Sequence, residues 1–194
     1  MNVRTCGDTA ILLDCEDLDE AQRWFAALED STDAVLGAKT VLLRGVPERL
    51  RALVARITPA DKAADEDHPV LDIPTRYDGE DLAEVAGLTG LSTTEVVAAH
   101  TGSVWTVAFG GFAPGFAYLT DGDPRLTVPR RDSPRKAVPA GAVGLAGSFS
   151  GVYPRESPGG WQLIGHTTLA MWDLDREPPA LLHAGRRVRF VEVL

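Results

Sequence analysis

The chain has 194 residues, of which 44% are hydrophobic, and a formal net charge of -9 at pH 7. This length allows one large or two small domains, and the acidic balance argues against general binding to nucleic acid. The N-terminal sequence lacks the features of a secretory signal, and no apolar run approaches the ~20 residues that span a bilayer. Since the only cysteines are Cys6 and Cys15, we expect reduced thiols and a cytoplasmic protein.

Residues 1–78 are predicted to form a ferredoxin-like α+β domain. Apolar runs indicate strands, and apolar residues at helical spacing indicate two helices. In chain order the expected elements are a strand at 10–13, a helix at 18–28, a hairpin of 34–36 and 40–43, a helix at 47–57 and a strand at 70–74. This β-α-β-β-α-β order is that of the split βαβ unit. The polar, acidic stretch 58–69 is expected to be a surface loop.

Residues 79–194 are predicted to contain a helical connection followed by a β-barrel. Two short helices are expected at 80–86 and 93–100, and the pattern from Ser92 to Glu95 is a capping box that begins the second one. From residue 104 onward, short strand-like segments alternate with glycine and proline turns. That alternation is typical of a compact barrel or sandwich of many short strands.

Two Pro-Gly pairs in this region fit the central positions of type II turns. Proline sets the first φ and glycine accepts the positive second φ. The pairs are Pro114-Gly115 and Pro158-Gly159.

Cationic residues gather in one segment of this acidic chain: Arg125, Arg130, Arg131, Arg135 and Lys136. A local cationic loop suggests a site for an anion such as a carboxylate or a phosphate. The alternative is a solvated loop in which the arginines pair with nearby aspartates, because exposed ion pairs are common and contribute little. Charge alone leaves both interpretations open.

Aromatic residues surround the Pro114-Gly115 turn and recur further along the chain. They either pack in the core or form the wall of a pocket for a flat, small ring. The residues that share this ambiguity are Phe112, Phe116, Tyr118, Tyr153 and Trp161.

His100 is expected at the end of a helix, shortly before the aromatic turn. A histidine there can bind a carboxylate or move a proton near neutral pH. The alternative is a histidine that is favoured at a helix C-terminus by the helix dipole.

Common self-contained catalytic motifs are absent. The sequence has no P-loop, no His-Glu-x-x-His zinc motif and no Gly-x-Ser-x-Gly elbow, and none of its lysines, Lys39, Lys62 and Lys136, is flanked by methionine as in a biotin carrier. We therefore expect no biotin and no metal ligand set in this chain. An enzymatic role would require a partner that completes the site.

Four segments, in this order, resemble the family of 5-oxoprolinase B subunits, which is also described as KipI-like or as allophanate hydrolase subunit 1. The segments are GFAPGFAYL (111–119), DPRLTVPRRDSPRKAVPAGAVGLAG (123–147), GVYPRESPGGWQLIG (151–165) and RVRF (187–190). The resemblance implies a cyclophilin-like barrel and ATP-dependent opening of 5-oxo-L-proline to L-glutamate. It also implies partner subunits C and A, with ATP as a co-substrate shared with them.

The resemblance also implies roles for individual residues. It implies catalytic roles for His100 and Arg131. Substrate or phosphate binding is implied for Phe112, Pro114, Gly115, Phe116, Tyr118, Arg130, Arg135, Tyr153, Trp161 and His166. The chain departs from the family pattern at His166, where relatives carry arginine, and at Ala142 and Phe149, where relatives carry serine and glutamine.

Two other functions stay open. Some relatives are described as inhibitors of a sensor histidine kinase, although no kinase-recognition feature is identifiable in this sequence. Urea or allophanate metabolism is the third possibility, because urea carboxylases contain a similar domain. No Ser-Ser-Lys amidase signature is evident, which argues against allophanate hydrolysis by this chain itself.

Overall fold

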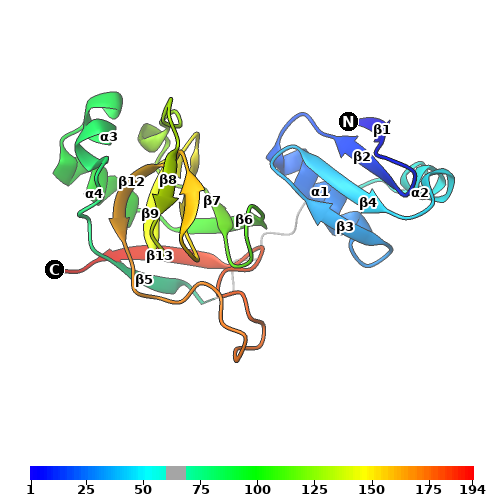
Figure 1. The fold of residues 1–194 in the computed structure, drawn as a ribbon. Helices are drawn as coiled ribbons and strands as arrows, with labels where there is room; N and C mark the ends of the chain where they lie inside the picture. Colours follow the sequence, from blue (N-terminus) through cyan, green and yellow to red (C-terminus); the bar gives the residue numbers. More distant parts are fainter. Residues whose placement is uncertain (60–68) are drawn as a thin grey trace. The chain divides into compact units, whose positions relative to one another are not determined.

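The computed structural model describes residues 1–59 and 69–194 (Figure 1). Contacts between Cα atoms divide the chain into two compact units, Met1–Glu66 and Asp67–Leu194. The division falls earlier than the expected boundary after residue 78. Part of the surface loop predicted at 58–69 lies outside the described residues.

The N-terminal unit is a four-stranded antiparallel sheet with two helices. Its elements are β1 (Asn2–Thr5), β2 (Ala10–Asp14), α1 (Leu18–Leu28), β3 (Asp33–Leu36), β4 (Thr40–Arg44) and α2 (Pro47–Val54). The strand order across the sheet is β1-β2-β4-β3. In β4, Val41 and Leu43 are fully buried while their neighbours are not, which is the period of two expected for a strand with one face on the core.

Helix α1 follows the predicted bounds and buries Ala21, Trp24 and Leu28 on one face. It begins at Asp17, whose side chain accepts a hydrogen bond from the backbone N–H of Glu20 at 2.8 Å. Such an N-cap satisfies one of the backbone donors that the first turn of a helix leaves free.

The predicted ferredoxin-like order is not confirmed. The strand expected at 70–74 belongs instead to the C-terminal unit, where it is β5 (Leu71–Thr75) and pairs in parallel with β13 (Arg187–Glu192). The edge of the N-terminal sheet, beside β2, is occupied by β1, which the apolar pattern did not reveal because its residues are largely exposed.

The C-terminal unit is built on a seven-stranded sheet with the order β12-β9-β10-β7-β6-β13-β5. Its remaining elements are α3 (Leu82–Thr89), α4 (Thr93–Thr101), β6 (Trp105–Gly110), β7 (Ala117–Thr120), a 3-10 turn η1 (Pro124–Leu126), β8 (Arg135–Val138), β9 (Ala142–Ala146), β10 (Phe149–Val152), β11 (Ser157–Gly159) and β12 (Gln162–His166). Figure 1 shows β5 and β13 side by side, as their pairing requires.

The two ends of this sheet meet, so that it is a nearly closed barrel. Arg76, directly after β5, exchanges two backbone hydrogen bonds of 2.8 Å with His166 at the end of β12. The chain continues along β12, where the N–H of Gly79 donates to Ile164 and that of Asp81 donates to Leu163. Closure pairs the edges that an open sheet would expose. The mixed α/β class with a barrel is thus confirmed, and the cyclophilin-like assignment stays a prediction.

Two short sequence patterns, a capping box and a Pro-Gly turn, form the structures that they predict. The capping box is present: Ser92 accepts from the N–H of Glu95, and the Glu95 carboxylate accepts from the N–H of Ser92. Pro114-Gly115 forms the predicted turn, with Gly115 at φ 83° and a bond from Phe116 N–H to Ala113 oxygen at 2.9 Å. The second predicted turn is wrong, because Pro158 and Gly159 lie in β11, which pairs with β8.

Candidate functional site

A small cavity of about 120 Å³ lies in the C-terminal unit. The pocket is lined by aromatic side chains, one arginine and two glycines: Phe112, Phe116, Tyr118, Arg130, Tyr153, Gly159, Gly160 and Trp161. We call it the aromatic pocket. Because sites for drug-sized ligands occupy ~300–1,000 Å³, this pocket suits only a small molecule.

Phe116 lies at the centre of the aromatic wall. Its ring centroid is 5.4 Å from that of Tyr153, 5.3 Å from that of Trp161 and 5.2 Å from that of Tyr118, all edge to face. Edge-to-face contacts at these distances are the favourable arrangement for aromatic rings. Both sequence interpretations therefore apply to this set, since Phe116 is buried and also lines the pocket.

Phe112 differs from the other aromatic residues because it is 58% exposed. Its backbone has φ 66°, a left-handed conformation that is uncommon for a bulky side chain. Its ring lies 6.0 Å from that of Tyr153. Such strained residues concentrate at ligand sites, which agrees with the place of Phe112 at the aromatic pocket.

The Pro114-Gly115 turn supports the pocket without lining it. A Cβ atom on Gly115 would meet the Cβ of Trp172 at 2.8 Å and the backbone oxygen of Met171 at 3.1 Å. Only glycine accommodates both this close approach and the positive φ. The turn therefore fixes the entry of the chain into the segment that carries Phe116.

The arginines of the cationic segment separate into two groups. Arg130 lines the aromatic pocket and is exposed. Within residues 1–59 and 69–194, its side chain makes no hydrogen bond or ion pair. Arg125, in contrast, binds Asp123 through a 2.6 Å contact, as the solvated-loop alternative predicts.

Arg131 and Arg135 share a buried carboxylate. Arg131 Nη1 lies 2.6 Å and Arg135 Nη2 2.7 Å from Oδ1 of Asp81, whose side chain is 3% exposed. The sequence did not reveal this partner, because Asp81 is about fifty residues away from them. Neither arginine lines the aromatic pocket.

Tyr153 is buried and lines the pocket. Burial raises the pKa of its hydroxyl, and the N–H of Trp161, which donates to it, and the charge of Arg130 offset only part of that rise. The hydroxyl therefore stays protonated at neutral pH. The hydroxyl oxygen accepts the bond from the backbone of Trp161, and no hydrogen bond donated by its own proton is found among residues 1–59 and 69–194.

His100 lies in the interior and not at the pocket. It is fully buried, its Nδ1 is 2.7 Å from the Tyr77 hydroxyl and its Nε2 is 2.8 Å from the Ser150 hydroxyl. Burial lowers the pKa of the imidazole to about 3, so the ring is neutral at physiological pH. This position supports a structural role, and direct proton transfer to a ligand would require the side chain to reach the surface.

His166 is also outside the pocket. It ends β12 and its Nδ1 lies 2.7 Å from Oδ1 of Asp78, in an exposed pair. Together with the backbone bonds to Arg76, this contact joins the two ends of the barrel sheet.

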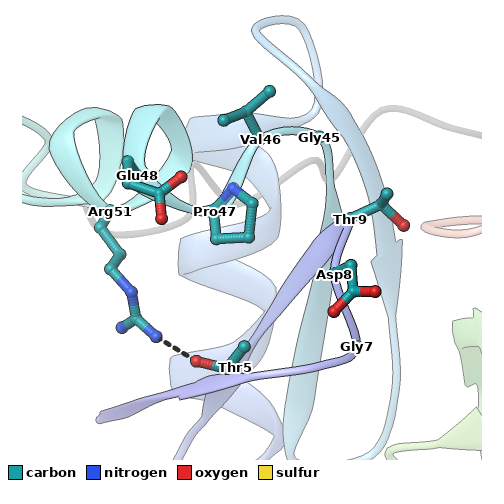
Figure 2. A pocket seen from close by; sticks show the side chains of 9 residues that line it. All are labelled: Thr5, Gly7, Asp8, Thr9, Gly45, Val46, Pro47, Glu48 and Arg51. Atoms are coloured by element: carbon teal, nitrogen blue, oxygen red, sulfur yellow. Dashed lines mark hydrogen bonds between the residues drawn. The ribbon is translucent and has the colours of Figure 1, made fainter.

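A second, larger hollow lies in the N-terminal unit (Figure 2). It has a volume of about 550 Å³ and is lined by residues around β1 and the start of α2. Figure 2 shows Arg51 pointing to Thr5, to which it donates a 2.6 Å hydrogen bond. The hollow also carries the acidic side chains of Asp8 and Glu48, and it includes none of the residues that the sequence indicated for a site.

Two kinds of feature are absent from the part of the chain that the structure describes. None of its helices combines the length and the apolar character required to cross a membrane. No group of three or more of its His, Cys, Asp or Glu side chains gathers as a metal site would require.

The sequence-indicated residues divide by position. The structure brings six of them to the pocket: Phe112, Phe116, Tyr118, Arg130, Tyr153 and Trp161. The pocket residues that the sequence missed are Gly159 and Gly160. Their Gly-Gly pair was the available signal, but the preceding proline suggested a turn rather than a strand edge beside a cavity.

The fold and the pocket define a β-barrel protein with a small aromatic site that includes one arginine. The sequence matches the family described as "Carboxyltransferase domain, subdomain C and D" over residues 1–182. It is 41% identical to the 5-oxoprolinase B subunit of Escherichia coli O157:H7, over 95% of this chain and 93% of that protein. The chain therefore belongs to the family of this carboxyltransferase domain that includes the 5-oxoprolinase B subunits.

Other relatives cover different shares of their own length. The 5-oxoprolinase B subunit of Bacillus subtilis is 48% identical over 64% of this chain, and the match spans 53% of that protein. The crystal structure of TTHA0988 aligns with 100% of this chain at a TM-score of 0.79 and 36% identity, but the chain spans only 40% of it. The Kluyveromyces lactis urea amidolyase has the same fold at 20% identity, with a TM-score of 0.77 over 98% of this chain and 15% of that one.

Proposed function

We propose that this chain is the B subunit of an ATP-dependent 5-oxoprolinase and that the aromatic pocket binds the small cyclic substrate. The observation that carries the proposal is Arg130, an arginine without a carboxylate partner among the described residues, in a pocket of otherwise aromatic and glycine residues. The names of the relatives supply the substrate, because three of them are 5-oxoprolinase B subunits at 36–48% identity.

The pocket chemistry fits a flat lactam that carries a carboxylate. Phe116 and Trp161 offer apolar ring surface to a planar amide ring. The planar guanidinium of Arg130 matches a carboxylate in a bidentate manner. In this proposal the Tyr153 hydroxyl donates its proton to a hydrogen bond with the lactam carbonyl oxygen.

These groups bind and orient, but they do not hydrolyse. Tyr153 stays protonated, and the described lining of the aromatic pocket includes no histidine or carboxylate. We therefore expect the general base and most contacts to ATP from partner subunits C and A, and the isolated chain to be inactive. The aromatic pocket is also too small for a nucleotide, so ATP is assigned to another surface of the complex.

The test is turnover by the assembled subunits. The chain is purified with subunits C and A, and ATP-dependent glutamate formation from 5-oxo-L-proline is measured beside assays with urea and allophanate. We expect activity with 5-oxo-L-proline only, and none from the chain alone. Turnover of urea or allophanate instead would overturn the proposal.

Arg130→Lys then tests the pocket within that complex. Lysine keeps the charge but loses the planar fork, so KM for 5-oxo-L-proline is expected to rise about tenfold, the equivalent of ~1.4 kcal/mol. The matched control is Arg125→Lys, which lies in the same cationic segment but pairs with Asp123. If both variants keep the wild-type KM, the aromatic pocket is not the substrate site.

A further inference from the structure

Asp81 joins three separate segments of the C-terminal unit through one buried carboxylate. Its Oδ1 accepts from Arg131 at 2.6 Å and from Arg135 at 2.7 Å. Its Oδ2 accepts from the backbone N–H of Leu163 in β12 at 2.7 Å. Asp81 stands at the N-cap position of α3, yet its side chain makes no capping hydrogen bond there. The carboxylate is therefore directed to the other two segments and not to its own helix.

The two segments that Asp81 binds each adjoin part of the aromatic pocket. Arg131 follows Arg130 directly, and its backbone N–H donates to the oxygen of Gly160, a pocket residue, at 2.8 Å. Leu163 lies two residues after Trp161, which also lines the pocket. A shift of the arginine segment relative to β12 would thus change the position of Arg130 in the lining of the aromatic pocket.

The surroundings of Asp81 keep its carboxylate ionised. Burial on its own would raise the pKa of Asp81, but the hydrogen bonds from Arg135 and Leu163 and the charges of Arg135 and Arg131 outweigh it and hold the pKa below its usual range. A buried ionised carboxylate with three donors is a strong anchor, because removing one member leaves the others uncompensated. It also pairs with Arg131 and Arg135, whereas Arg130, the arginine that lines the aromatic pocket, forms no ion pair among the described residues.

We propose that Asp81 is a positioning residue that holds the segment bearing Arg130 against the pocket wall. It contacts no ligand, and it acts by ordering residues 129–136 against β12. The ligand part of this inference rests on the proposed function, whereas the ordering of the segment does not.

The variant is Asp81→Asn, which keeps the size of the side chain and removes the charge. The matched control is Glu80→Gln, because Glu80 binds the same arginine, Arg135, at 3.1 Å but is 79% exposed. Hydrogen–deuterium exchange of residues 129–136 is measured in the full chain by mass spectrometry. We expect exchange at least about tenfold faster in Asp81→Asn, since ~1.4 kcal/mol corresponds to a factor of ten, and no change in Glu80→Gln. Unchanged exchange in Asp81→Asn would refute the positioning role.

A double-mutant cycle distinguishes positioning from general destabilisation. In the assembled complex, Asp81→Asn is expected to raise KM for 5-oxo-L-proline about tenfold with little change in kcat. In an Arg130→Gln background the same change should have almost no further effect on KM, because the group that Asp81 positions is gone. An equal rise in both backgrounds would mean that Asp81 does not act through Arg130. If the wild-type complex does not consume 5-oxo-L-proline at all, the proposed function fails, while the exchange measurement still decides the role of Asp81.

Discussion

Two neighbouring glycines of the aromatic pocket should respond in opposite ways to alanine. A Cβ atom on Gly159 would lie 2.3 Å from the Tyr153 hydroxyl oxygen and 2.9 Å from two ring carbons. On Gly160 the nearest atom would be Cβ of Pro134 at 3.6 Å, an ordinary contact. Both glycines are described by the structure and neither has a positive φ. The two positions therefore differ in steric contact and not in backbone strain.

The expected magnitudes follow from these contacts. Tyr153 is 2% exposed and packs against Phe116, so it cannot withdraw without disturbing the aromatic wall. Overpacking of this kind costs about 1–3 kcal/mol, and each kcal/mol lowers the melting temperature by about 2–4 °C in a chain of this size. Gly160→Ala should be neutral or stabilising by about 0.4–1 kcal/mol, because alanine restricts the unfolded chain.

The assay is thermal unfolding of each full-length variant, followed by near-UV circular dichroism for the aromatic environment. Gly159→Ala is expected to lower the melting temperature by roughly 2–12 °C and to change the aromatic signal, whereas Gly160→Ala does neither. Equal melting temperatures and spectra for the two variants would refute the close packing of Gly159 on Tyr153.

Three further predictions concern the scaffold. Ser92→Ala removes the capping box at α4 and should lower the free energy of unfolding by about 1 kcal/mol in urea titrations, whereas Thr94→Ala in the same helix is the control. The pKa of His100 is about 3 in the folded chain and about 6.5 when unfolded, so between these pH values the unfolded state binds one more proton than the folded state. The free energy of unfolding should therefore fall by up to ~1.4 kcal/mol per pH unit as the pH drops from 6.5. His100→Gln should remove this contribution to the slope. Limited proteolysis should yield a stable C-terminal fragment that begins before β5, and a fragment that begins after residue 78 would contradict the pairing of β5 with β13.

The parts of the fold that the sequence predicted are those governed by local spacing. Helix α1 has the predicted bounds, and the hairpin β3–β4 and the capping box of Ser92 lie where their patterns indicated. Each depends on interactions within a few residues, such as an apolar face at helical spacing or one side chain that caps one backbone group.

The errors come from pairing over long distances. The strand at 71–75 was recognised, but its partner is β13, more than a hundred residues later. Pro158-Gly159 has a turn sequence, yet the pairing of β11 with β8 keeps it extended. In both cases the residues allow more than one partner, and the tertiary fold decides among them: β5 joins the seven-stranded sheet, and β11 joins β8 in a separate two-stranded sheet.

The sequence by itself determined that the chain has an acidic α+β composition, a cluster of arginines and a set of aromatic residues beside a Pro-Gly turn. Charge alone could not show which of the arginines are paired with a carboxylate, because Arg130 and Arg131 are adjacent and carry the same charge. Only the tertiary structure decided this, by placing the buried carboxylate of Asp81 beside Arg131 and Arg135. An ion pair forms between groups that the fold brings within hydrogen-bond distance, and that proximity is a property of barrel closure and not of the local sequence.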